Sequence, residues 1–421
     1  ETHLVPTTNY DSAGEPHFYT HHPPLIVWLS AISATGLGLH EMALRFVVAS
    51  LTLVSVAAFY VMVRRLLDPN RAIIAASLYA LTPMTLYFGR MPNHEPLALA
   101  VGMIFAAILL NWLRQPTRSR WIALTVLAII AAWSMWGAVM LISCLILAGM
   151  VMGSRRQRWE LLITGLVMAG AVAVLLIYYE LAVPGAFEEL IRSFSFRSSD
   201  TIGYGVVRNF SWLEFASQQV IDLLINLTPG VLLIGLFGLV ITLRAQSRRT
   251  QIMALALWGM AVVYILILHN AAYEHDFYKF FFVPAVALTG AIGVASALKS
   301  RRGRPVIVAL LIVSSIFSVV YTGFMHSIAR YPREPMVLHS IQTYINPDDA
   351  LVSNVSTVSI GMLYYLNRPL TFPVKPDEIL RTSRPDPVLY IYCPADQLPD
   401  DLKTYPYQTD DYCTYVHLPA D

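Results

Sequence analysis

The chain has 421 residues and a net charge of +2, with 56% hydrophobic and only 13% charged residues. Soluble globular proteins contain about 25% charged residues. The composition, together with a mean hydropathy of +0.56, therefore excludes an ordinary soluble domain and predicts a polytopic membrane protein. We expect the lipid bilayer to be a partner of this chain, and we expect no nucleic-acid partner.

Apolar segments follow one another through the first three quarters of the chain and predict ten membrane spans. They cover residues 42–63, 72–88, 96–113, 121–135, 137–153, 160–181, 220–243, 252–268, 278–298 and 305–325. The stretch 25–40 is short and interrupted by Ser and Gly. It therefore predicts a helix at the membrane surface rather than a span.

Basic residues gather in five short loops between these spans. The loops hold sixteen of the 29 Lys and Arg residues: Arg64, Arg65 and Arg71; Arg114, Arg118 and Arg120; Arg155, Arg156 and Arg158; Arg244, Arg248 and Arg249; Lys299, Arg301, Arg302 and Arg304. The positive-inside rule predicts that all five lie in the cytoplasm. The apolar run 121–153 has such a loop at each end, so it must cross the membrane an even number of times. We expect a hairpin of two helices that turns near Trp136-Gly137.

By the same reasoning the remaining loops lie outside the cytoplasm. These outer loops are residues 1–41, 89–95, 182–219 and 269–277. The sequence thus predicts an all-α membrane domain over 1–325 and, over the polar residues 326–421, a small extracytoplasmic α/β domain. In the latter, strand-like runs cover Ala350–Val355, Val388–Tyr392 and Thr414–Leu418, and a helical pattern covers Ser359–Leu366.

The three cysteines divide between the two predicted domains. Cys144 lies in an apolar run and reads as a small buried residue. Cys393 and Cys413 lie in the polar tail, where a compartment outside the cytosol would allow a disulfide. We predict that they form one.

Polar residues gather in the outer loops, while the spans carry almost no charge. His21 and His22 directly precede Pro23-Pro24 and an apolar helix pattern. Free amides and the helix dipole favour an anion at such a helix N-terminus. Three other loops contribute further groups: Arg90, His94 and Glu95; Glu188, Glu189, Arg192, Arg197, Asp200 and Arg208; and the segment from His269 to Lys279. The sequence predicts a reaction at the outer membrane surface on an anionic amphiphile.

Several of these segments resemble, in order, those of GT-C glycosyltransferases that use polyprenyl-phosphate sugars, such as protein O-mannosyltransferases and the lipid A aminoarabinose transferase. His22-Pro23-Pro24-Leu25 resembles the His/Lys-Pro-Pro-Leu motif of that family, and Glu41 to Arg45 resembles the start of its following span. Arg90 to Glu95 is similar to its acidic second outer loop. Tyr278-Lys279 to Pro284 resembles its Tyr-x-x-x-Pro region. The resemblance covers about residues 10 to 300, and the tail matches nothing in the family.

The resemblance implies a GT-C-like fold and a glycosyltransferase whose partners are a polyprenyl-phosphate-linked sugar donor and a lipid, glycan or protein acceptor. It places His22 at the donor phosphate, with Arg197 and Lys279 as further phosphate contacts. Glu95 would act as a catalytic group that orients the acceptor or binds a divalent ion. His21, Arg90, His94 and Tyr278 would bind substrate. Family members differ in their use of metal, so the cofactor stays open between none and a divalent metal ion.

One family feature has no counterpart in this sequence. In the family an acidic residue follows the first span, whereas Asp11 and Glu15 lie too close to the Pro-Pro motif to match it. The chain starts at Glu1 without an apolar segment, so we expect a further span and its acidic residue upstream. A lipid-linked-sugar transporter or flippase, or a non-catalytic binding protein at the outer surface, remain alternatives. Ionisable groups near the bilayer midplane would favour transport.

Overall fold

The computed structural model describes residues 5–10, 16–38, 40–199, 210–330, 343–346, 348–354, 370–371, 375–381, 384, 386–392, 398–409 and 413–420. Two compact units divide the chain: residues 20–323 form one, and residues 1–19 together with 324–421 form the other. The division falls between residues 323 and 324, and the sequence predicted a boundary between 325 and 326. The first nineteen residues, however, group with the C-terminal unit and not with the membrane domain.

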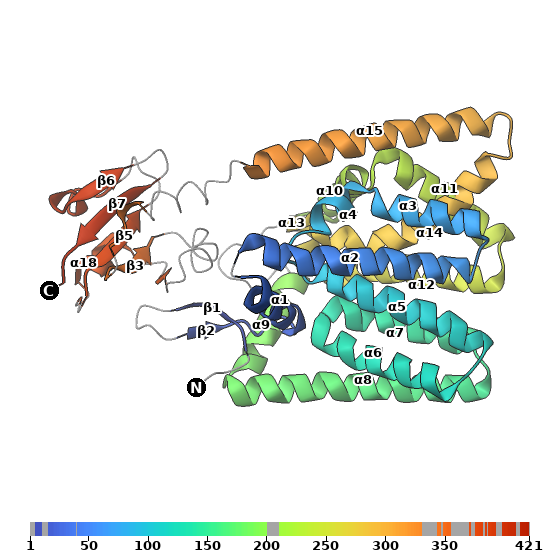
Figure 1. Cartoon of the computed structure of the whole chain (residues 1–421), viewed down its shortest axis with the longest axis horizontal. Helices are drawn as coiled ribbons and strands as arrows, with labels where there is room; N and C mark the ends of the chain where they lie inside the picture. The colour runs from blue at the N-terminus through green and yellow to red at the C-terminus, as the bar shows by residue number, and fades with distance from the viewer. Residues whose placement is uncertain are drawn as a thin grey trace. The chain divides into compact units, whose positions relative to one another are not determined.

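The membrane unit is a bundle of helices (Figure 1). Its helices are α1 Leu25–Leu37, α2 Glu41–Arg64, α3 Pro69–Ala80, α4 Pro83–Phe88, α5 Glu95–Arg114, α6 Arg118–Ser134, α7 Trp136–Met152, α8 Arg155–Ala182, α9 Ala186–Ser198, α10 Trp212–Leu227, α11 Pro229–Ala245, α12 Arg248–Ile267, α13 His269–Glu274, the 3₁₀ helix η1 Asp276–Phe281, α14 Phe282–Ala297 and α15 Gly303–Arg330, which continues into the other unit.

Six helical segments of the described chain are long and apolar enough to cross a membrane, or seven with the bent pair α10–α11. This is fewer than the ten expected spans. The predicted span 72–88 is broken between α3 and α4, where Thr82 caps a helix that starts with Pro83. The predicted span 220–243 bends by 105°. The bend lies at Thr228, which has a positive φ of 68° and precedes Pro229.

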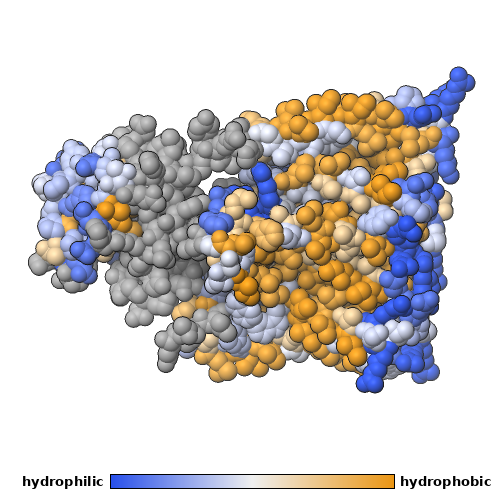
Figure 2. Space-filling view, viewed as in Figure 1, coloured by the Kyte–Doolittle hydropathy of each residue, from blue (hydrophilic) through white to orange (hydrophobic). Residues whose placement is uncertain are grey.

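The predicted hairpin over 121–153 is present: α6 and α7 meet at Met135, one residue from the expected turn. Figure 1 shows the turns α2–α3, α5–α6, α7–α8, α11–α12 and α14–α15 at the same end of the bundle, and these are the five basic loops. Figure 2 shows this end as a hydrophilic border beside an apolar surface. The elements α1, α9 and α13 lie at the other end (Figure 1).

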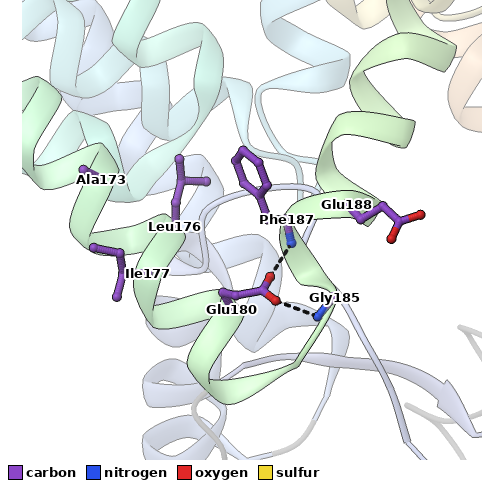
Figure 3. Close-up of a pocket in the computed structure, with 7 residues that line it drawn as sticks. All are labelled: Ala173, Leu176, Ile177, Glu180, Gly185, Phe187 and Glu188. Carbon is purple, nitrogen blue, oxygen red and sulfur yellow. Dashed lines mark hydrogen bonds between the residues drawn. The ribbon is translucent and has the colours of Figure 1, made fainter.

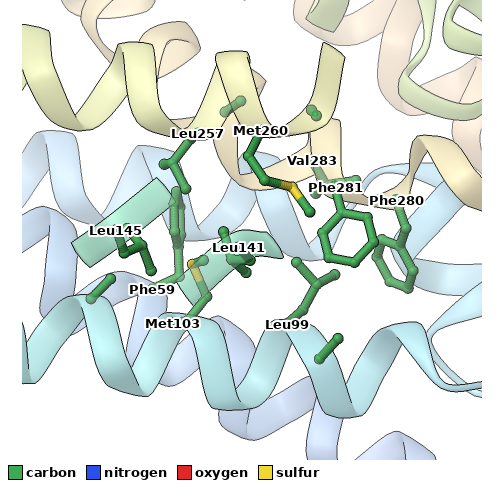
Figure 4. Close-up of a cluster of buried hydrophobic side chains, with 14 of the residues drawn as sticks. Phe59, Leu99, Met103, Leu141, Leu145, Leu257, Met260, Phe280, Phe281 and Val283 are labelled. Atoms are coloured by element: carbon green, nitrogen blue, oxygen red, sulfur yellow. The ribbon is translucent and has the colours of Figure 1, made fainter. Parts of the chain in front are cut away.

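The core of the bundle is built around α5 and the segment η1–α14, each 83% buried over its apolar window, whereas α8 is only 22% buried. Figure 4 shows side chains from α2, α5, α7, α12 and η1 converging in this core, namely Phe59, Met103, Leu141, Met260 and Phe281. Gly238 of α11 faces the carbonyl oxygen of Thr289 in α14 so closely that a Cβ would lie 1.8 Å from it. The absence of a side chain there lets the two helices pack in contact.

The second unit contains a mixed seven-stranded sheet in the order β2-β1-β4-β3-β5-β7-β6. Its strands are β1 Thr7–Tyr10, β2 Pro16–Phe18, β3 Ala350–Ser353, β4 Leu370–Thr371, β5 Val388–Tyr392, β6 Tyr407–Thr409 and β7 Thr414–Leu418, with helix α18 Pro376–Arg381 and the 3₁₀ helix η3 Leu402–Thr404. Three of these strands agree with the predicted runs. The residues before Thr20 join this sheet because β1 pairs with β4.

Two predictions about this unit fall partly or wholly outside the described residues. The helical pattern at Ser359–Leu366 lies outside them. Cys413 is disulfide-bonded and Cys144 is not. The expected partner, Cys393, lies outside the described residues, so the Cys393–Cys413 bond stays a prediction.

Candidate active site

The His21-His22 pair lies directly before α1, as expected from the prolines that follow it. Two aromatic side chains from other helices hold its backbone. The indole Nε1 of Trp136, at the start of α7, donates to the carbonyl oxygen of His21 at 2.8 Å. The hydroxyl of Tyr179 in α8 donates to the carbonyl oxygen of His22 at 2.7 Å. These bonds fix both imidazoles at one end of the bundle.

The ring of His21 contacts helix α9. Its Nε2 lies 3.0 Å from Oε1 of Glu189, and the other oxygen of Glu189 lies 3.6 Å from Arg192 on the same helix. Among the described residues, no group of three or more His, Cys, Asp or Glu side chains is arranged to hold a metal ion. His21 and Glu189 are donor types that metals bind, but here they contact each other.

His22 contacts the second outer loop. Its ring stacks on that of His94, with 4.7 Å between centroids and 30° between planes. His94 is the last residue before α5, and Glu95 is the first residue of that helix. Glu95 is only 1% exposed. Its Oε2 is buried and has no hydrogen-bond partner within the part of the chain that the structure describes. Two loops far apart in sequence thus bring together two imidazoles and one carboxyl group.

Arg197, near the end of α9, supplies a permanent positive charge to this group. Its guanidinium donates to the hydroxyl of Ser193, one turn earlier on the same helix. The amide of Asn270 donates to the carbonyl oxygen of Phe196 at 2.7 Å and so joins α9 to α13. Arg197 is therefore held from both sides.

Burial, and secondarily the charge of Arg197, set the state of the two stacked imidazoles. Burial, and after it the charge of Arg197, lower the pKa of His94 from 6.5 to about 4. The pKa of His22 is also well below its ordinary value, first through burial and then through His94, Arg197 and His21. Both rings are therefore neutral near pH 7. A bound anion would oppose the effect of Arg197 and favour their protonation.

Aromatic side chains from α12 and η1 line the same region. Tyr278 is 4% exposed and stacks on Tyr264, with 5.4 Å between centroids. Tyr264 lies within electrostatic range of both Glu95 and Arg197. His275 stacks beside Tyr278 at 6.3 Å. Tyr278, expected at the substrate, thus belongs to the wall of this region.

Lys279 contacts a different set of groups. It is fully buried, and its Nζ lies 2.7 Å from Oδ2 of Asp222 in α10. The same nitrogen donates to the carbonyl oxygens of Ala272 and, at 3.2 Å, of His275. All three N–H bonds of the ammonium group therefore have acceptors. In this structure Lys279 therefore contacts protein acceptors, and its contact with the donor phosphate, which the resemblance implied, stays a prediction.

The structure brings together five of the eight predicted residues, namely His21, His22, His94, Glu95 and Arg197, and places Tyr278 in the adjoining wall. Arg90 is half-buried in the turn between α4 and α5. Sequence reasoning missed the residues that position the site. Those residues are Trp136, Tyr179, Glu189, Ser193, Asp222, Tyr264 and Asn270. Glu189 and Asn270 carried a signal, because Glu189 lies in the polar loop with Arg197 and Asn270 in the polar segment from His269 to Lys279.

Residues 21–179 match the family model described as dolichyl-phosphate-mannose-protein mannosyltransferase. No curated protein sequence matches the chain.

Solved structures show where the fold recurs. The fold superposes on ArnT from Cupriavidus metallidurans bound to undecaprenyl phosphate, with a TM-score of 0.71, 13% identity, and coverage of 95% of this chain and 88% of that one. The apo form of ArnT gives a TM-score of 0.69 and 14% identity over the same shares. The oligosaccharyltransferase AglB from Archaeoglobus fulgidus, in complex with an inhibitory peptide and a dolichol-phosphate, gives 0.52 and 12% identity over 88% of this chain and 58% of that one. The expected GT-C fold is confirmed.

Proposed function

We propose that this chain, a membrane glycosyltransferase with the GT-C fold, transfers a sugar from a polyprenyl-phosphate donor to an acceptor hydroxyl outside the cytoplasm. The family match and the ArnT-like fold support the reaction class and the lipid donor. The observation that carries the proposal is the buried Glu95, whose Oε2 lacks a partner among the described residues and lies beside the His22–His94 stack. A buried carboxyl group without a partner is costly, and such groups gather at functional sites.

The site offers separate groups for the two halves of the reaction. Arg197 and the imidazoles of His22 and His94 face the donor phosphate. As the bond between the anomeric carbon and the phosphate oxygen breaks, the electron pair stays on the phosphate. Positive charge held in place there stabilises the growing negative charge. His22 and His94 can also take up a proton on binding the phosphate, because they are neutral beforehand.

Glu95 serves the acceptor. The acceptor oxygen forms the new bond to the anomeric carbon and loses its proton to the Glu95 carboxylate, as in general-base catalysis of an inverting transfer. His21 and Tyr278 border the sugar, and Arg90 lies in the turn just before the His94-Glu95 pair.

The position of the charges supports the orientation. The basic loops lie at one end of the bundle, and α9, α13 and the α1 start lie at the other (Figure 1). The positive-inside rule puts the basic end in the cytoplasm. We therefore place the site and the β-sheet unit outside it, as in a bacterial inner membrane.

The test is transfer from a radiolabelled polyprenyl-phosphate sugar by the full-length protein in membranes. Glu95→Gln keeps the shape of the side chain and removes its base, so turnover should fall by about 10²-fold or more while donor binding stays nearly unchanged. Glu41→Gln is the matched control, because Glu41 is also the first residue of a long helix but is exposed. Wild-type turnover by Glu95→Gln would remove Glu95 from the reaction.

A further inference from the structure

Helix α9 presents three different faces. Successive residues of an α-helix are about 100° apart, so Phe187, Ile191 and Phe194 fall within a sector of about 60°. These three side chains are 49%, 50% and 52% exposed. They form an unbroken apolar face, which we call the apolar face of α9.

The other two faces are polar. Glu189, Ser193 and Arg197 lie on the side that contacts the active site, through His21 and the Arg197–Ser193 bond. Glu188 and Arg192 lie between the two, and both are exposed. Their mutual ion pair of 3.2 Å connects side chains that are 80% and 52% exposed. One face toward lipid, one toward water and one toward protein is the pattern of a helix lying in the membrane interface.

The apolar face of α9 continues a surface that faces lipid. Helix α8 is long and apolar enough to span the membrane, and its outer half exposes Val174, Ile177 and Leu181 at 57%, 59% and 80%. Between α8 and α9 lies a groove of about 520 Å³. Figure 3 shows its wall, formed by Ala173, Leu176, Ile177 and Phe187.

A carboxylate holds the two helices at a fixed angle around this groove. Glu180 of α8 accepts hydrogen bonds from the backbone N–H groups of Gly185 and Phe187, each at 2.9 Å (Figure 3). It therefore satisfies amides at the start of α9, where a negative charge also suits the helix dipole. The position of α9 thus follows from where α8 leaves the membrane.

We propose that the apolar face of α9 is embedded among the acyl chains of the outer leaflet, and that this contact with lipid sets the position of Arg197 at the site. Helix α9 then contacts lipid on one side and carries Arg197, the cation that faces the donor phosphate, on the other. The consequence for activity rests on the proposed function, whereas the contact with lipid does not.

The first experiment locates the face. A benzophenone amino acid replaces Phe194, and in a second protein it replaces Arg192, in full-length protein in vesicles of phosphatidylglycerol and radiolabelled phosphatidylethanolamine. Irradiation should label the protein through position 194 and not through position 192. Label at both positions, label at neither, or a crosslink from 194 to another polypeptide would overturn the proposal.

The second experiment connects the face to the site. Phe194→Ser removes most of an apolar side chain that the proposal places among the acyl chains. It should therefore raise the KM for a long-chain donor in vesicles about tenfold and leave kcat nearly unchanged. Phe194→Leu should restore the wild-type KM. With a short water-soluble donor in detergent, Phe194→Ser should equal wild type. An equal loss with both donors would show that Phe194 only supports folding, and would overturn the coupling. If neither the wild-type protein nor any variant transferred sugar, while position 194 was still labelled by lipid, the proposed function would be contradicted and the contact with lipid would stand.

Discussion

Two buried ionisable groups in the membrane unit, Glu95 and Lys279, are equally hidden from solvent and differ in their partners. Glu95 is 1% exposed and Lys279 is 0% exposed. Oε2 of Glu95 has no hydrogen-bond partner within the described residues, whereas Lys279 contacts Asp222 and two carbonyl oxygens. A buried polar atom without a hydrogen-bond partner costs stability, and such a group is available to bind a substrate. Burial with every donor satisfied suits a group that holds the fold.

The surroundings of the two groups follow the same division. Glu95 lies beside the His22–His94 stack. Lys279 joins α10 to the backbone of α13, together with Gln219, whose amide donates to the carbonyl oxygen of Ala272 at 3.1 Å. The pair Lys279–Asp222 therefore holds the segment that carries His275 and Tyr278. In the structure this pair positions that wall.

The largest effect should come from breaking this buried ion pair. Lys279→Met leaves Asp222 as an uncompensated buried charge, and this should destabilise the protein by about 3–5 kcal/mol. The double variant Lys279→Met/Asp222→Leu should recover most of that loss, because it removes both charges. The measurement is the midpoint of thermal unfolding in detergent.

Two variants calibrate that result. Glu95→Gln should unfold at or above the wild-type temperature, since it replaces a buried carboxyl group whose Oε2 has no hydrogen-bond partner among the described residues. Glu41→Gln should change the midpoint little, because the Glu41–Arg45 pair is exposed, with side chains 49% and 36% accessible. If Lys279→Met were as stable as wild type, the contrast between Lys279 and Glu95 would fail.

Much of this contrast could not be read from the sequence, because it depends on contacts between distant segments. Both residues stood in polar outer segments, and the motif resemblance assigned both to substrate. The partner of Lys279 lies on α10, inside a stretch read as one straight span. Hydropathy shows that this stretch is apolar, and the sequence therefore predicts a single span there. It does not predict the bend at Thr228, since the positive φ of a threonine follows from tertiary packing and not from local propensity.

Local sequence patterns predicted the elements whose formation depends on one segment of the chain alone. The strands at Val388–Tyr392 and Thr414–Leu418 and the α6–α7 break were predicted within one residue. Helix α9 was missed inside the loop 182–219, although the spacing of Phe187, Ile191 and Phe194 marks it as amphipathic in hindsight. The pairing of β1 with β4 could not be predicted, because strands of four and two residues carry too little pattern to specify a distant partner.

A smaller effect on stability should come from His94, whose charge changes with pH. The folded-state pKa of His94 is lowered to about 4 from an ordinary value of 6.5. Between these values the unfolded chain binds more protons than the folded one, so stability is complete above about pH 6.5 and falls as the pH drops toward 4. The expected loss that belongs to His94 is about 3 kcal/mol.

The measurement is the unfolding midpoint at a series of pH values, for wild type and for His94→Gln. The variant should lose less stability than wild type over this interval. Parallel profiles for wild type and His94→Gln would show that His94 takes no part in the loss of stability at low pH.

The smallest effect concerns the hydrogen bond that places Arg197. The amide of Asn270 donates to the carbonyl oxygen of Phe196 at 2.7 Å, next to Arg197 in the chain. Asn270→Ala removes one such bond, worth about 1 kcal/mol. Because Arg197 faces the donor phosphate in the proposed reaction, the KM for the donor should rise about fivefold with little change in the unfolding midpoint. Ser198→Ala is the control: among the described residues its hydroxyl donates to the carbonyl oxygen of Phe194 in the same helix, so its KM should stay at the wild-type value. A fall in kcat at unchanged KM would instead place Asn270 with the groups that serve the acceptor, on the side of Glu95.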